Sequence, residues 1–153
     1  MNDVVLEWIV PYFMPVKKRL LKAVLLSAAV VLIADGILFY PVILLPAVVL
    51  AAVDFFLFRS WKLEFEYSYV NGDLTISKII HKEKRKDVFH CERKEIQWVQ
   101  KGRVPTEHAK PKDFSSGWEK ASVYTLKTAD RTVYIEPNEE FLQEMTIYRK
   151  VKQ

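Results

Sequence analysis

Two aspartates interrupt an otherwise apolar segment of this 153-residue chain. Residues 20–58 carry no other charge except one lysine, and the two acids are Asp35 and Asp54. A carboxylate inside a segment of membrane length suggests a proton or ion site, or a contact with a partner helix. The structural alternative is that each acid reaches water near an end of the segment, with Asp54 paired to Arg59 or Lys62. Asp35 and Asp54 are therefore candidate intramembrane polar contacts.

A group of cations in a predicted turn is the second candidate site: Lys82, Lys84, Arg85 and Lys86. The acids Glu83 and Asp87 dilute its charge. Close to an anionic membrane surface, each cation contributes about 1 kcal/mol of attraction. One interpretation is a contact with anionic lipid or an acidic partner, and the other is a hairpin tip that is charged because it faces water.

The sequence gives little indication of catalysis or metal binding. His90 and Cys91 are adjacent in a predicted strand, so their side chains point to opposite faces and do not readily chelate one metal. The chain has no HxxxH or CxxC pair, no glycine-rich phosphate loop and no nucleophile elbow. We therefore expect neither an enzyme nor a cofactor, and the net charge of +4 is too mild to indicate nucleic-acid binding.

The apolar segment has the length of two membrane crossings. A bilayer core about 30 Å thick is crossed by about 20 helical residues. Pro41 lacks an amide hydrogen and disfavours helix at the preceding residue, so it suits the end of one helix and the start of the next. We expect a transmembrane hairpin over residues 20–60, with helices at about 20–39 and 42–58 and a turn within Leu38 to Val42.

Basic residues flank this hairpin on both sides, whereas its turn has none. The flanking cations are Lys17, Lys18, Arg19 and Lys22 before it, and Arg59 and Lys62 after it. The positive-inside rule then predicts a multi-pass protein of the cell membrane with both termini in the cytoplasm. A cleaved signal peptide fits poorly because the apolar run is too long and starts too late. A small soluble protein could hardly bury two helices that are apolar on every side.

The N-terminal residues 1–19 mix apolar side chains, including Trp8, with a basic end. This composition suits an amphipathic segment, with a short helix ending at Pro11, that lies at the membrane interface. Docking of the segment onto the cytoplasmic domain is the alternative.

We place the cytoplasmic domain at residues 61–153. In its first residues apolar and polar side chains begin to alternate with a period of two. In "KLEFEYSYVNG" the residues Leu63, Phe65, Tyr67 and Tyr69 share one face, as in a half-buried strand. Asn71-Gly72 is typical of a tight hairpin turn. The strands "DLTISKII", "DVFHCE", "EIQWVQ", "SVYTLKT" and "RTVYIEP" bring the predicted number to six.

Two further segments complete the predicted domain. Residues 101–120 lose all periodicity and are expected to form a long mobile loop. The chain then ends in a helix at residues 138–151, with Asn138 as its N-cap. Its apolar stripe consists of Phe141, Leu142, Met145 and Tyr148.

This succession of strands and one terminal helix resembles the pleckstrin-homology (PH) superfold, and specifically the bacterial PH-like domains that follow membrane hairpins. The resemblance is carried by "YSYVNGDLTISKII", "KEIQWV" and "RTVYIEPNEEFLQEM". The opening "MNDVVLEWIV" and the whole layout are similar to an uncharacterised family of small membrane proteins of Gram-positive bacteria. The resemblance implies an α+β membrane protein with a small antiparallel β domain capped by its C-terminal helix. PH-like sheets usually have seven strands, so one strand remains to be found, and the irregular segment is where we expect it.

The sequence thus predicts a non-enzymatic, membrane-anchored binding or scaffold module that presents a PH-like domain at the cytoplasmic surface. Its expected partners are the lipid bilayer and either anionic lipid or a membrane protein, with no nucleic acid. The alternative is an accessory or regulatory subunit of a larger membrane complex.

Overall fold

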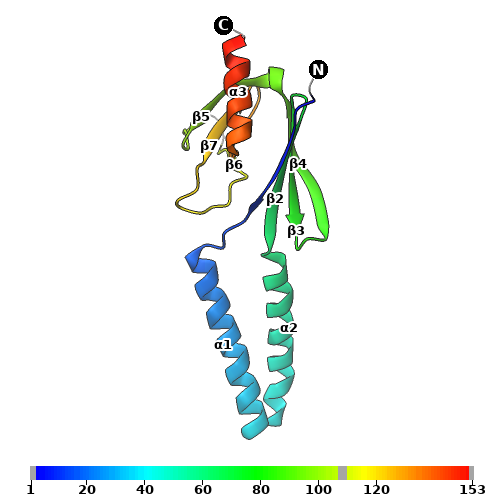
Figure 1. Ribbon diagram of the computed structural model, residues 1–153. Coiled ribbons are helices and arrows are strands. Elements are labelled where there is room, and N and C mark those ends of the chain that lie inside the picture. The colour runs from blue at the N-terminus through cyan, green and yellow to red at the C-terminus, as the bar shows by residue number, and fades with distance from the viewer. Residues whose placement is uncertain (1–2, 107–109, 152–153) are drawn as a thin grey trace. The chain divides into compact units, whose positions relative to one another are not determined.

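The computed structural model describes residues 3–106 and 110–151, with side chains described as far as residue 147. The chain forms two compact units. One unit consists of Met1–Phe13 together with Leu63–Gln153, and the other is Met14–Lys62 (Figure 1). The helical unit is therefore an insertion within the β-rich domain, which begins at the N-terminus and not, as the sequence suggested, at residue 61.

The helical unit contains α1 (Val16–Leu38), a 3-10 turn η1 (Pro41–Ile43) and α2 (Leu44–Ser60). Tyr40 is extended, with φ of −135°, and Pro41 opens the next helix as predicted. Helix α1 begins earlier than expected because the basic residues before the apolar run form its first turn. Both spans are long and apolar enough to cross a membrane.

Small residues line the contact between α1 and α2. Ala29, Gly36 and Ala47 are all buried. A Cβ atom on Gly36 would lie 2.8 Å from the Leu44 side chain, so only glycine permits this close approach beside the turn. Such small-residue contacts are typical of helices that pack within a membrane.

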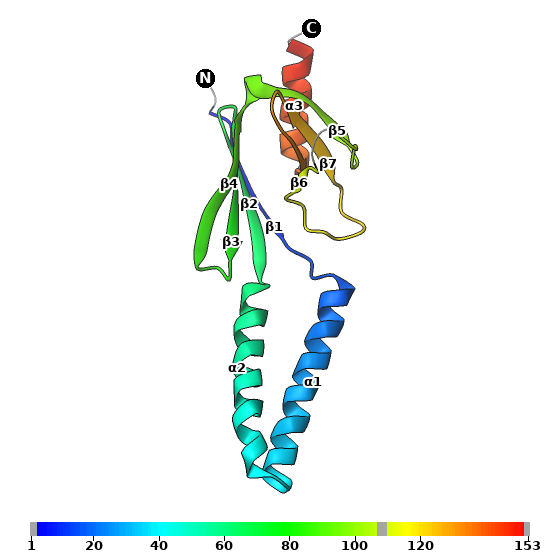
Figure 2. The same ribbon diagram turned by 180° about the vertical axis from the view of Figure 1, so that it is seen from behind.

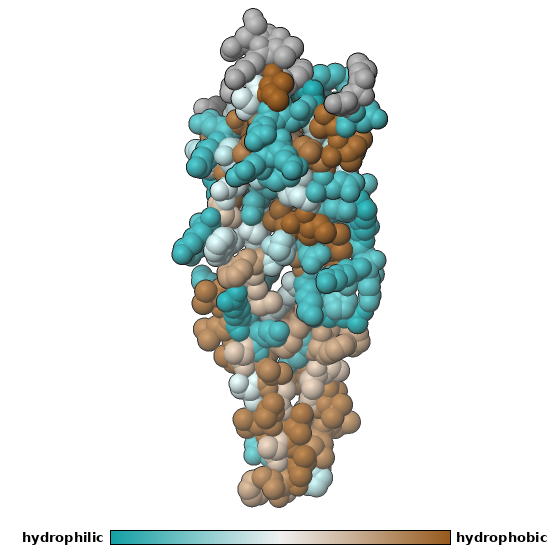
Figure 3. Space-filling view, in the orientation of Figure 1, coloured by the Kyte–Doolittle hydropathy of each residue, from teal (hydrophilic) through white to brown (hydrophobic). Residues whose placement is uncertain are grey.

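The remaining surface of both helices is apolar and exposed, as Figure 3 shows over α1 and α2. Only 11% of the most apolar stretch of each span is buried inside the structure. Because a helix of a soluble core would be mostly buried, this exposure fits a lipid environment.

The β-rich unit is built from two four-stranded sheets. The first sheet has the order β1-β2-β3-β4, and all of its strands are antiparallel: β1 (Val5–Pro11), β2 (Leu63–Val70), β3 (Asp73–Ile80) and β4 (Lys84–Glu92). A 3-10 turn, η2 (Arg93–Glu95), leads to the second sheet. That sheet has the order β5-β7-β8-β6: β5 (Ile96–Lys101), β6 (Lys112–Asp113), β7 (Tyr124–Thr128) and β8 (Thr132–Ile135). The two sheets and helix α3 (Glu139–Val151) appear from both sides in Figures 1 and 2.

Strand β1 shows that the N-terminal segment is not a helix and that it docks onto the β-rich domain, which was the alternative to an interfacial segment. Its side chains alternate, so that Trp8 and Val10 point to the core whereas Val5 and Ile9 are exposed. Trp8 stacks on Tyr67 with ring centroids 5.0 Å apart. Pro11 is tolerated because β1 is an edge strand.

Strand β6 is the additional strand expected within residues 101–120, but the expectation that this segment is otherwise a mobile loop is wrong. This two-residue strand pairs in parallel with β8, and Phe114, Ser115 and Ser116 directly after it are buried. The Phe114 ring lies 5.8 Å from that of Phe65 and 6.0 Å from that of Phe89. A segment expected to be a mobile loop is thus fixed to the core, and β1 and β6 bring the strands of the described residues to eight.

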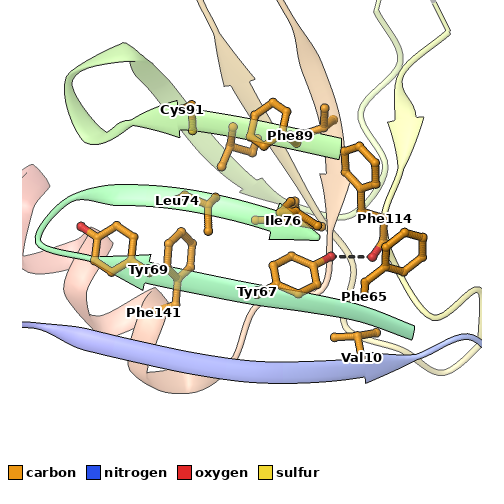
Figure 4. Packing of buried hydrophobic residues seen from close by; sticks show 13 residues of the cluster. Val10, Phe65, Tyr67, Tyr69, Leu74, Ile76, Phe89, Cys91, Phe114 and Phe141 are labelled. Atoms are coloured by element: carbon orange, nitrogen blue, oxygen red, sulfur yellow. Dashed lines mark hydrogen bonds between the residues drawn. The ribbon is translucent and has the colours of Figure 1, made fainter. Parts of the chain in front are cut away.

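The predicted β-hairpin turn at Asn71-Gly72 and the predicted C-terminal helix with its N-cap Asn138 are both confirmed. Asn71 and Gly72 both have positive φ, 52° and 105°, as the tight turn requires. The Phe141 N–H donates to Oδ1 of Asn138 at 2.9 Å, which makes Asn138 the N-cap of α3. Phe141 is fully buried, 5.2 Å from the Tyr69 ring (Figure 4). The side chain of Tyr148 lies outside the described residues.

Because β1 contributes to the core, we predict that the β-rich domain is less stable without this strand. A fragment that starts at Leu63 loses β1 and exposes the site that Trp8 and Val10 fill. Burying side chains of this size stabilises by about 1.5–3 kcal/mol each, a large part of the roughly 5–15 kcal/mol of a small domain. We expect a fusion in which a short glycine-rich turn replaces Met14–Lys62 to unfold cooperatively on heating, as followed by circular dichroism. The fragment Leu63–Gln153 should unfold at a clearly lower temperature, and equal midpoints would contradict the role of β1.

Candidate functional site

The four predicted cations lie on the β3–β4 hairpin, and all four are exposed. The strand register divides them between two faces. Arg85 points to the face that carries Glu66 and forms an ion pair with it at 3.0 Å. Lys84 and Lys86 point to the other face, where Lys78 lies directly across from Lys86.

Lys82 lies in the turn itself with φ of 59°, next to His81 with φ of 54°. Arg93 and Lys94, which follow β4 in the chain, form their contacts away from this turn. Arg93 donates to the Tyr69 hydroxyl at 2.6 Å and pairs with Glu144, and Lys94 pairs with Glu92. Within the described part of the chain, Lys82, Lys84 and Lys86 form no ion pair, although Glu83 lies between the first two of them in the sequence.

The turn between β3 and β4 lies at one end of the first sheet. At this same end β1 continues into the connection to α1, and β2 begins after the connection from α2. Leu63 pairs with Ile80, the last residue before the turn, and Pro11 pairs with Glu64. The Tyr12 N–H donates to the Leu63 carbonyl at 2.9 Å. The register thus brings the basic turn to the same sheet end as both connections.

Two exposed aromatic side chains lie beside the first of these connections. The Phe13 N–H donates to the Ser116 carbonyl at 2.7 Å, which holds the loop after β6 against the end of β1. Phe13 is 39% exposed and Trp118 is 48% exposed, with ring centroids 6.5 Å apart. About half of the Trp118 side chain is therefore open to its surroundings.

The two aspartates of the helical unit have different surroundings. Asp35 is exposed on α1, near the turn. Asp54 is only 3% exposed, and neither oxygen of its carboxyl group has a hydrogen-bond partner. The expected ion pair of Asp54 with Arg59 or Lys62 is therefore not formed. Lys22 lies over the ring of Phe58, one turn further along α2, at 5.1 Å from its centroid.

Buried polar groups within the β-rich unit are used for structure. The Tyr67 hydroxyl donates to the Phe114 carbonyl at 2.5 Å and accepts from the Glu136 N–H at 3.3 Å (Figure 4). Burial raises the pKa of Tyr67 above its ordinary value. Burial likewise raises the pKa of Cys91 to about 12, so this thiol stays protonated at neutral pH. Neither group is a nucleophile under physiological conditions.

Histidine and carboxylate side chains do not converge on a metal site. His90 is exposed, hydrogen-bonded through Nδ1 to Thr75 at 3.0 Å, whereas Cys91 points into the core. Within residues 3–106 and 110–151, no three His, Cys, Asp or Glu side chains are grouped so that they could hold a metal ion. His108 lies outside the described residues.

A groove of about 520 Å³ in the β-rich unit has no counterpart in the sequence analysis. It runs between β4, the β7–β8 turn and the segment around β6. Its cations are Lys110, Lys112, Lys127 and Arg131, and its apolar lining includes Val88, Phe89, Trp98 and Val133. Because these residues come from separate strands and loops, no local motif could have revealed the groove.

Because the carboxyl group of Asp54 is buried without a hydrogen-bond partner, we predict that replacing Asp54 by an apolar residue stabilises the helical unit. A buried carboxyl group without a partner costs about 1–3 kcal/mol. We therefore expect Asp54→Leu to raise the unfolding free energy of the full chain in detergent by roughly that amount, as followed by helical circular dichroism. The control Asp35→Leu, at an exposed position, should change it by less than about 0.5 kcal/mol. Loss of stability in Asp54→Leu would instead indicate that the carboxyl group binds something essential.

Comparison with known proteins agrees with this architecture. No curated protein and no solved structure matches the chain. One family model, described as bacterial PH-like domain (DUF6106), matches residues 2–153. The match therefore includes β1 and the helical insertion as well as the strands that follow. The chain belongs to this family of bacterial PH-like domains.

Proposed function

We propose that the protein is a non-enzymatic binding module anchored in the cell membrane, whose PH-like domain contacts anionic lipid headgroups at the cytoplasmic surface. The helical hairpin crosses the bilayer twice, and both termini are cytoplasmic. Lys82, Lys84 and Lys86 form the headgroup contact. The observation that carries this proposal is the insertion of a membrane-length hairpin between two paired strands, at the sheet end that bears these lysines.

The pairing of β1 with β2 supports this topology independently of the distribution of charges. Two strands in one sheet must be on one side of a membrane, so a hairpin between them must leave and return on that side. The positive flanks of the helices then favour the cytoplasmic side.

Short connections support a contact between the domain and the membrane surface. Only Met14 and Pro15 separate the domain from α1, and only Trp61 and Lys62 separate α2 from it. With consecutive Cα atoms 3.8 Å apart, two intervening residues span about 11 Å at most. The connections therefore limit how far the chain can run between the helices and Phe13 or Leu63, and the exposed Phe13 and Trp118 suit an interfacial environment.

The charges of the β3–β4 turn determine how strongly we expect this turn to bind anionic lipid headgroups. Arg85 is compensated by Glu66, so three lysines remain. At about 1 kcal/mol each near an anionic surface, they contribute roughly 3 kcal/mol. Physiological salt screens this attraction over about 8 Å, which makes the short connections essential.

An accessory role in a larger membrane complex is the second proposal, and it rests on Asp35. This carboxylate is exposed on the apolar surface of α1, where a partner helix could pair with it. Asp54 is unsuited to that contact because its side chain is already buried within the hairpin.

The lipid contact can be tested with a nitroxide label on the basic turn of the full chain. We expect a label on Glu83→Cys, in a Cys91→Ala background, to lose accessibility to a water-soluble paramagnetic reagent when anionic lipid is added to zwitterionic nanodiscs. Exchange of Lys82, Lys84 and Lys86 for glutamate should abolish that change, because like charges repel.

The matched control exchanges Lys110, Lys112 and Lys127 for glutamate, which alters the net charge equally but at another place on the domain. This control should respond to anionic lipid as the parent chain does. If the label is equally accessible with and without anionic lipid, the hairpin is a solvent-exposed tip and the headgroup contact is refuted.

A further inference from the structure

Strand β1 is the outermost strand of the first sheet, so one of its edges pairs with β2 and the other has no partner strand (Figure 1). The Tyr12 N–H donates to a carbonyl of β2, and in this antiparallel register the even-numbered residues before it are hydrogen-bonded to β2 as well. The alternation of the strand then directs the backbone N–H and C=O groups of the odd-numbered residues away from β2. Within β1 these residues include Val5, Glu7 and Ile9.

The domain itself uses this outer edge only beyond the end of β1. The Phe13 N–H, which points to the same edge, donates to the Ser116 carbonyl at 2.7 Å. Within the described part of the chain, the backbone groups of Val5, Glu7 and Ile9 form no hydrogen bond at this edge. The side chains of Val5 and Ile9 are more than half exposed. The edge therefore presents three donors and three acceptors, spaced as in a strand, to a further strand.

The opposite edge of the same sheet, β4, is protected, whereas β1 is not. Soluble proteins block exposed edges with charged side chains, bulges or covering segments. Strand β4 has three consecutive cations at residues 84–86, its register with β3 shifts once, and Arg131 donates to its His90 carbonyl. Strand β1 pairs without a register shift and exposes the apolar side chains of Val5 and Ile9, with a proline only at its last position. An unprotected edge of this kind is typical of a site to which another strand is added.

Glu7, between the two exposed apolar side chains, determines which strand fits this edge. Glu7 is exposed and forms no ion pair within the described residues. If β1 of a second copy paired here with Val5 opposite Ile9, Glu7 would lie opposite Glu7, and like charges directly opposite each other destabilise a sheet. A shift of that register by two residues would instead set Glu7 opposite an apolar side chain. The strand that fits has a basic residue opposite Glu7 and apolar residues opposite Val5 and Ile9.

We propose that the outer edge of β1 binds an extended segment of a partner protein, which adds a fifth strand to the first sheet through the backbone of Val5, Glu7 and Ile9. The side chains of this segment that share the face of Glu7 are apolar, basic and apolar in turn. Main-chain hydrogen bonds supply the affinity of such a contact, and the alternate side chains supply its specificity. None of the β1 residues belongs to the basic turn between β3 and β4, so this contact does not depend on the proposed binding of lipid headgroups.

Two heptapeptides test this proposal on the full chain in zwitterionic nanodiscs. One has valine, lysine and valine at its second, fourth and sixth positions and threonine elsewhere, and the other has glutamate in place of lysine. Both sequences are palindromes, so either strand direction sets the fourth residue opposite Glu7. Amide hydrogen exchange, resolved by NMR, should slow at Val5, Glu7 and Ile9 when the lysine peptide is added. The amides of Leu6 and Trp8 are already hydrogen-bonded to β2 and should change little.

The parent chain should bind the lysine peptide about tenfold more tightly than the glutamate peptide, because an attractive cross-strand pair replaces a repulsive one. In Glu7→Lys this preference should reverse. The matched control Glu119→Lys changes the net charge equally at an exposed loop position and should keep the preference of the parent chain.

The proposal is overturned if neither peptide slows exchange at Val5, Glu7 and Ile9, or if Glu7→Lys leaves the preference between the peptides unchanged. It is also overturned if these amides exchange slowly without peptide in nanodiscs that hold two chains but not in those that hold one, because the edge then binds a second copy.

Discussion

The antiparallel pairing of β1 with β2 is the constraint on which the whole protein depends. These strands are neighbours in the sheet, yet the chain between them contains a membrane-length helical hairpin. The core requires this pairing, because β1 supplies Val10 and the Trp8 ring that stacks on Tyr67. If the helical hairpin crosses a membrane as proposed, the sheet closes only when both ends of that hairpin emerge on one side, so that folding of the domain and insertion of the helices are coupled.

The same pairing determines which residues share the sheet end with the two connections to the helices. It brings Pro11, Leu63 and the turn after Ile80 to one sheet end, and the alternation of the strand then separates Lys84 and Lys86 from Arg85. The groove around Lys112 and Lys127 is positioned by the second sheet and is independent of this end. One small domain therefore carries an exposed basic hairpin between β3 and β4 and, formed by other strands, an apolar-lined groove.

Features that depend on neighbouring residues were predictable from the sequence. Alternation identified Phe65, Tyr67 and Tyr69 as core residues, Asn71-Gly72 identified the turn, and Asn138 identified the start of α3. The apolar run and Pro41 identified the two helices. In each of these cases the physical cause lies within a few residues of its effect.

Features that depend on distant residues were not predictable in this way. The partner of Glu7 is Ser68, beyond the whole helical insertion, so the sequence left open whether the N-terminal segment lies at the membrane interface or docks onto the domain. A further strand was expected within residues 101–120 from the strand count of PH-like sheets, but its position was not predictable because β6 has two residues and no period of its own. The compensation of Arg85 by Glu66 needs the register of three strands, and the burial of Asp54 needs the packing of α2 on α1. The groove is assembled from separate segments, and it emerges only once the sheets are formed.

The pairing of β1 with β2 across the membrane insertion is tested most directly by a disulfide. Hydrogen bonds from Tyr12 to Leu63 and from Asn71 to Val4 leave Glu7 and Ser68 as a non-hydrogen-bonded pair on the outer face. The Cα atoms of such pairs lie about 4.5 Å apart, a distance that a disulfide can bridge. Oxidation of Glu7→Cys/Ser68→Cys in a Cys91→Ala background, in native membranes, should link the strands nearly completely. The control Leu6→Cys/Ser68→Cys, with side chains on opposite faces, should not form the link. If the first pair stays reduced under oxidant, with both thiols open to maleimide, the two strands do not pair and the account fails.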